Sequence, residues 1–188
     1  IEPRSGNRAL DRALAQSLAT ISREFGVLPG FAYYTEQGAP NARAMSEKRL
    51  DHADGTVLFG LKLLQLLLGR TRPDAAIIAV CAHEFGHIVS YKNGMIRQLD
   101  PTGGQQPFRA EQFADFMAGY FAGRRKLVHR DFPAAVFAAT QNSFGGSSSH
   151  GSGQQRGAAV QEGFLTAYQK GLQGSNAIQA GFNYAMAQ

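Results

Sequence analysis

The chain has 188 residues, of which 44% are hydrophobic, and this length suits one domain with a buried core rather than two domains. The single cysteine, Cys81, excludes an intramolecular disulfide and a cysteine-rich zinc module. The net charge of +5 would suit nucleic-acid binding, but the basic residues are scattered along the chain. Their densest run, residues 124–126, lies where a helix is expected to end, and cations are favourable there. No nucleic-acid partner is therefore expected.

The first third of the chain predicts one helix followed by a small sheet. Apolar residues recur at helical spacing over residues 7–25, and a glycine ends this segment. The charged residues 46–54 predict a loop or a hairpin connection. Three strands are expected, over residues 31–35, 42–45 and 56–59.

The rest of the chain predicts helices separated by glycine- and proline-rich breaks. The apolar cluster at 61–68 is too short to cross a membrane, so no transmembrane segment is expected. The stretch 144–149 predicts a flexible connection, and residues 172–188 predict a tail that docks loosely or frays. The expected helices cover residues 61–68, 73–91, 111–121, 133–140 and 152 or 153 to 168.

These elements predict an α+β, mostly helical fold class. We expect a single domain over residues 1–188, in which the small sheet packs on the helix over 73–91.

Residues 83–87 read His-Glu-Phe-Gly-His, inside the helix expected over 73–91. Two histidines four positions apart lie on one face of a helix, so both imidazoles can bind one zinc ion. Glu84 then lies beside the metal, where its carboxylate can take a proton from water. The pattern predicts a metallopeptidase site with His83 and His87 as zinc ligands and Glu84 as general base.

Catalytic zinc normally has three protein ligands, so a third ligand is needed. Glu111 and Asp115 lie one turn apart on a later expected helix. We expect Glu111 to bind the metal and Asp115 to accept the free ring N–H of a ligating histidine. On their own, Glu111 and Asp115 would indicate only a solvated helix face. Because the motif at 83–87 needs a third ligand, we favour the metal-site interpretation. Cys81 is expected to point away from the metal and into the core.

These motifs resemble a known family. Residues 83–87, followed by Glu-Gln-Phe-Ala-Asp-Phe-Met-Ala-Gly at 111–119, are similar to the bacterial neutral zinc metallopeptidases. That family belongs with the gluzincins, which complete H-E-x-x-H with E-x-x-x-D on a later helix. Residues 149–156, Ser-His-Gly-Ser-Gly-Gln-Gln-Arg, are similar to the family's H-G-S-x-x-Q-R segment, and the related CAAX-prenyl-protease-like gluzincins carry an analogous histidine and arginine. The resemblance covers residues 77–164 and implies a zincin-like metallopeptidase domain.

The resemblance also implies roles for four further residues. His150 would donate to the oxyanion that develops during hydrolysis, and Arg156 would assist it or hold its loop in place. From the residues alone, His150 is better interpreted as a mobile surface histidine in a Gly/Ser loop. Asn41 and Ala42 correspond to the edge-strand Asn-Ala of many gluzincins, and an extended peptide would bind along that strand.

The predicted function is therefore a zinc-dependent peptidase with one Zn²⁺ as cofactor and a peptide or protein as substrate. The alternative is a protein with a catalytically silent or latent zinc site that binds peptides without cutting them, in which His150 would fill the fourth ligand position. The first residue, Ile1, fits either a processed export precursor or a truncated chain. Together with the resemblance, it favours an exported, periplasmic or membrane-associated bacterial protein over a cytoplasmic one.

Overall fold

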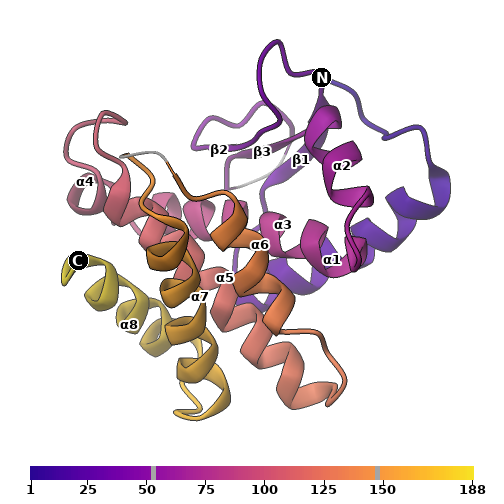
Figure 1. Ribbon diagram of the computed structural model, residues 1–188. Coiled ribbons are helices and arrows are strands. Elements are labelled where there is room, and N and C mark those ends of the chain that lie inside the picture. Colours follow the sequence, from indigo (N-terminus) through magenta and orange to yellow (C-terminus); the bar gives the residue numbers. More distant parts are fainter. Residues whose placement is uncertain (52–53, 147–148) are drawn as a thin grey trace.

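A three-stranded sheet lies across one side of a group of helices in the computed structural model of the chain (Figure 1). The structure describes residues 1–51, 54–146 and 149–188, so parts of the expected connections 46–54 and 144–149 lie outside the described residues. The mostly helical α+β class is confirmed. In chain order the elements are α1 (Arg8–Phe25), β1 (Gly30–Tyr34), β2 (Ala42–Met45), β3 (Thr56–Gly60), α2 (Leu61–Leu68), α3 (Pro73–Lys92), α4 (Ile96–Leu99), α5 (Phe108–Val128), α6 (Ala135–Ser143), α7 (Gly153–Tyr168) and α8 (Gly174–Met186).

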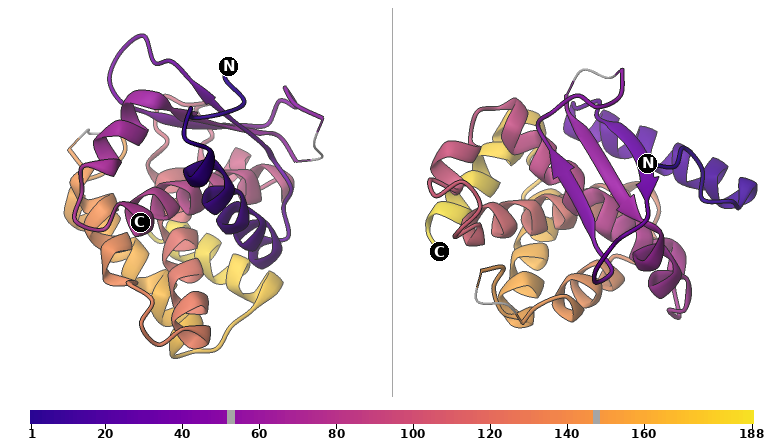
Figure 2. Two further views of the ribbon diagram at one scale, coloured as in Figure 1. Left: turned by 90° about the vertical axis from the view of Figure 1, so that its right-hand side faces the viewer. Right: turned by 90° about the horizontal axis from the view of Figure 1, so that it is seen from above.

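The sheet has the strand order β1-β3-β2, with β1 parallel and β2 antiparallel to β3. The central strand β3 is buried along its whole length. Glu2 bridges to Tyr33 at the β1 edge, whereas β2 forms the other edge of the sheet. The sheet packs on α3 as expected (Figure 2). The hydroxyl of Tyr91 in α3 donates to the carbonyl of Ala44 in β2 at 3.4 Å. The edge strand therefore runs beside the helix that carries the His-Glu-x-x-His motif.

Helices α3 and α5 form the centre of the core, and α6, α7 and α8 lie on the side away from the sheet (Figures 1 and 2). Helix α3 begins with a proline at its first turn, where the missing N–H costs no helical hydrogen bond. Cys81 is fully buried in the core, as expected. Among the described residues, no helix combines the length and the apolar character that a membrane span requires.

Of the two expected alternatives for the C-terminal segment, docking or fraying, the structure shows a docked helix, since residues 174–186 form α8 and pack against α5. Its buried residues are Ala177, Gly181 and Ala185, which are spaced four positions apart on one face. A Cβ at Gly181 would come within 2.7 Å of the Phe116 ring. Because the buried face of α8 consists of small residues, the spacing of the large apolar side chains does not predict this helix.

Helices α5 and α7 pack so closely that glycine is required at their contact. A Cβ added at Gly119 would overlap the carbonyl of Val160, and one at Gly163 would overlap the carbonyl of Phe116. Interiors are packed to crystal density, so neither helix can yield without shifting its neighbours. This contact sets the position of α7 relative to α5.

Replacing two glycines of α7 by alanine tests this packing. At Gly157 the nearest atom to an added Cβ lies 3.6 Å away, whereas at Gly163 the Cβ would overlap backbone. Alanine gains about 1 kcal/mol in helix propensity, and overpacking costs about 1–3 kcal/mol. We expect Gly157→Ala to raise the free energy of unfolding in urea and Gly163→Ala to lower it by up to about 2 kcal/mol. Equal effects of the two substitutions would contradict the close contact.

Candidate metal centre

The His-Glu-x-x-His motif lies in the middle of α3, on a stretch that is buried on nearly all sides. His83 and Glu84 are 5% and 7% exposed, and the side chain of His87 is 11% exposed. Polar groups in such surroundings need partners, because water no longer solvates them. The partners of the two histidines come from α5, and residues of α6 and α7 lie behind these partners.

The fourth residue of the motif, Gly86, allows α5 to approach. A Cβ at this position would lie 2.9 Å from the Cα of Ala114 and 3.1 Å from its carbonyl oxygen, closer than side chains tolerate. Without a side chain here, the two helices cross almost backbone to backbone. This contact brings Glu111, in the first turn of α5, to the face of α3 that carries both histidines.

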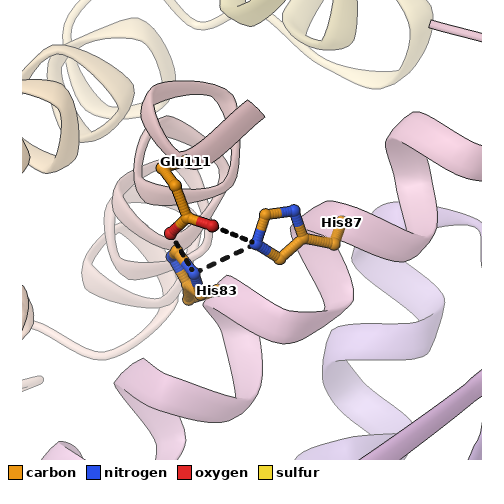
Figure 3. A group of neighbouring side chains, drawn as sticks. All are labelled: His83, His87 and Glu111. Carbon is orange, nitrogen blue, oxygen red and sulfur yellow. Dashed lines mark hydrogen bonds and ion pairs between the residues drawn. The ribbon is translucent and has the colours of Figure 1, made fainter. Parts of the chain in front are cut away.

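The side chains of His83, His87 and Glu111 point toward one another (Figure 3). The two histidine Nε2 atoms lie 3.2 Å apart. Nε2 of His83 is 3.3 Å from Glu111 Oε2, and Nε2 of His87 is 3.4 Å from Glu111 Oε1. Bonds of about 2.0–2.1 Å to a tetrahedral zinc ion place neighbouring ligand atoms about 3.3 Å apart. The three side chains therefore fit a single metal ion, and a buried group that could hold one is present as expected.

Asp115 makes the contact expected of it, since its Oδ1 lies 2.7 Å from Nδ1 of His83. Nδ1 can donate to this carboxylate, which leaves Nε2 with a lone pair that faces the other two side chains. Asp115 is fully buried, and it also accepts hydrogen bonds from Arg156. The arrangement orients the imidazole of His83 for a metal.

In the metal-free site, the histidines and carboxylates stabilise one another's charged forms. Burial lowers the pKa of His83, but the charge and hydrogen bond of Asp115 and the contact with Glu111 outweigh this and raise it to about 10. Burial raises the pKa of Glu111, and the two histidines outweigh this and hold it well below its usual range. A metal ion bound to Nε2 of His83 would take the place of the proton there as the positive charge beside Glu111.

A cavity of about 1070 Å³ opens beside the three side chains. Glu84 lines it, and in the described part of the chain its carboxylate forms no hydrogen bond. Ala42 at the start of the edge strand β2 and Asn41 just before it line the same cavity, and their expected role in peptide binding stays a prediction. Glu84 and a sheet edge therefore share one cavity with the three residues that could hold a metal.

The two remaining predicted site residues lie differently from one another. The half-exposed side chain of His150 lines the cavity, with Nε2 3.9 Å from Glu111 Oε1 and Nδ1 2.8 Å from the Ser149 hydroxyl. Arg156 is 5% exposed, and its guanidinium donates to Asp115 and Gln141. Arg156 also lines the cavity. Its two expected roles, to assist at the oxyanion or to hold the loop of His150, stay predictions.

Sequence reasoning missed Gln141, which is 1% exposed and lies in α6. Its side chain accepts from Arg156 at 2.9 Å and donates to the Ala79 carbonyl in α3 at 3.3 Å. The polar residues around it in the sequence are typical of a helix end, so no local signal marks it. Only the packing of α6 against α3 and α7 reveals its position.

Comparisons of the chain with protein-family models, curated proteins and solved structures give no match. The resemblance to the neutral zinc metallopeptidases therefore stays a prediction that depends on the motifs themselves.

The pKa of His83 generates a prediction for the metal-free protein. Because the folded pKa of about 10 lies above the ordinary value of 6.5, protonation of His83 stabilises the metal-free fold fully below pH 6.5, and this contribution is lost as pH rises toward 10. We expect the thermal unfolding midpoint of chelator-treated protein to fall over this pH window. Saturating zinc takes the place of the proton and should remove most of the fall. A midpoint whose pH dependence is the same with and without zinc would contradict the assignment.

Proposed function

We propose that this protein is a zinc-dependent peptidase that hydrolyses peptide bonds with Glu84 as its general base. The observation that carries the proposal is the separation of 3.2–3.4 Å among two imidazole nitrogens and a carboxylate on two different helices. Three protein ligands are typical of catalytic zinc, whereas structural zinc usually has four. A second carboxylate, Glu84, next to these ligands and facing a large cavity favours catalysis over a purely structural role.

His83, His87 and Glu111 would hold the metal. Zinc bound there would supply a Lewis acid that polarises a peptide carbonyl and makes water easier to deprotonate. Glu84 takes a proton from the attacking water and later passes it to the leaving amine. Burial raises the pKa of Glu84, which makes the ionised carboxylate a better base, while the charges of His83 and His87 partly offset this effect.

The edge strand β2 supports a peptide as the substrate. It pairs with β3 on one side, and its other side is an edge of the sheet beside the cavity. An extended peptide can add to such an edge through main-chain hydrogen bonds, which recognise a backbone regardless of side chains. Ala42 and Ala44 alternate with Arg43 along this strand, so small side chains face one side of the sheet.

Substitutions of Glu84 and Glu111 test the proposal. Glu84→Gln preserves the size of the side chain and removes its basicity, so we expect stoichiometric zinc with cleavage of a peptide library reduced about 10²–10⁴-fold. Glu111→Gln removes a ligand, so we expect loss of both zinc and cleavage. Zinc content by elemental analysis and cleavage by mass spectrometry measure the two effects separately. A Glu84→Gln protein as active as the unmodified chain would refute the mechanism.

The position of His150 favours a second candidate function, a latent zinc protein that holds peptides without cutting them. Its Nε2 lies 3.9 Å from Glu111 Oε1, close enough for a modest side-chain movement to place an imidazole at the metal position. A fourth protein ligand would close the site.

Replacing His150 by alanine separates the two candidates. If His150 donates to the developing oxyanion, His150→Ala lowers the cleavage rate by about 10²–10³-fold and leaves zinc content unchanged. If His150 closes the site, the same substitution raises cleavage above that of the unmodified chain. Cleavage of the peptide library by the two proteins at equal zinc content distinguishes these outcomes.

A further inference from the structure

A buried polar network lies behind the three candidate ligands, and Arg156 is at its centre. Nε of Arg156 donates to Oδ2 of Asp115 at 2.8 Å, and Nη2 donates to Oδ1 at 3.0 Å. The same Oδ1 faces Nδ1 of His83 at 2.7 Å. A two-point contact of this kind fixes the plane of the carboxylate as well as its position.

The guanidinium is itself held from the other side. Nη2 also donates to the Gln141 side-chain oxygen at 2.9 Å, and the Gln141 amide donates to the backbone carbonyl of Ala79 at 3.3 Å. Ala79 lies one helical turn before His83 on α3. The network therefore begins and ends on the helix that carries the histidines, and it passes through α6, α7 and α5.

We propose that Arg156 is a positioning residue of the metal centre, which acts through Asp115 and does not touch the substrate. It holds the Asp115 carboxylate where the imidazole of His83 must donate to it, and so directs Nε2 of His83 toward His87 and Glu111. Gln141 supports Arg156 in this position. The inference depends on the metal site of the proposed function, and it adds the residues that set how well that site is formed.

Two effects of Arg156 on metal binding have opposite signs. Its Nη2 lies 3.8 Å from Glu111 Oε2, so its positive charge repels a cation at the site. If charge alone mattered, removal of Arg156 would strengthen metal binding. If positioning dominates, its removal weakens binding, because partners of metal ligands commonly contribute about 10–100-fold to metal affinity. The direction of the change identifies the role.

The experiment compares Arg156→Met, Arg156→Lys and Gln141→Met with the unmodified chain, using Co²⁺ as probe. Dissociation constants come from competition with a chelator, and the visible absorption of bound Co²⁺ reports the ligand geometry. We expect Arg156→Met to bind Co²⁺ about 10–100-fold more weakly with an altered spectrum. Arg156→Lys keeps the charge and loses the two-point contact, so it should not restore binding. Gln141→Met should weaken binding in the same direction and less strongly.

Arg124→Met is the matched control. Arg124 also pairs with a carboxylate across two helices, with Nε 3.0 Å from Glu24, and it lies near the opposite end of α5 from Glu111. It should leave the Co²⁺ affinity and spectrum unchanged. If Arg156→Met does not fold, Arg156→Lys and Gln141→Met decide the question by the same measurements.

Three results would overturn the proposal. Unchanged or tighter Co²⁺ binding in folded Arg156 variants would assign Arg156 a charge effect or a structural role only. Reduced peptide cleavage with unchanged affinity and spectrum would instead place Arg156 against the substrate. If the unmodified chain binds no Co²⁺, the metal site of the proposed function fails, and this inference fails with it.

Discussion

The close crossing of α3 and α5 determines whether the candidate site exists. His83 and His87 share one helix and would converge in any helical context, but Glu111 arrives only because Gly86 lets the backbone of α5 come near. A side chain at this position would have to displace Ala114, and a shift of about 1 Å is enough to spoil metal coordination or catalytic geometry. The small residue inside the motif is thus as important for the site as the histidines.

The buried charges around this crossing are costly for folding unless they are paired. Asp115 and Arg156 satisfy one another, and Gln141 satisfies the remaining side of the guanidinium. Apolar residues of similar volume often stabilise a core as well as buried ion pairs do, so such a network is weak evidence of selection for stability. Its direct connection to His83 gives it a different role, which is to orient a ligand.

Much of the fold could be predicted from the sequence, because its elements carry strong local signals. The apolar period of residues 8–25, the turn glycines and the proline at the start of α3 gave element positions close to those observed. The four-residue helix α4 and the helix α8 were not foreseen. In α8 the buried face consists of alanine and glycine, and its helical character depends on contact with α5.

The candidate site was predictable to the extent that it follows from helix geometry. His83, Glu84 and His87 share one motif, and Glu111 and Asp115 are one turn apart, so spacing was sufficient to group them. The contacts of Arg156 and Gln141 depend on how α6 and α7 pack, which no local pattern encodes. Their polar character alone gave no sign that both would be buried behind the ligands.

The most direct test of the account is X-ray absorption spectroscopy at the zinc edge on the zinc-loaded protein. The account predicts one zinc ion per chain, with two imidazole nitrogens, oxygen from Glu111 and a further light-atom ligand from solvent at about 2.0–2.2 Å. A chain that takes up no stoichiometric zinc, or a spectrum with three imidazoles and no solvent ligand, would contradict the central claim of an open metal site at the crossing of α3 and α5.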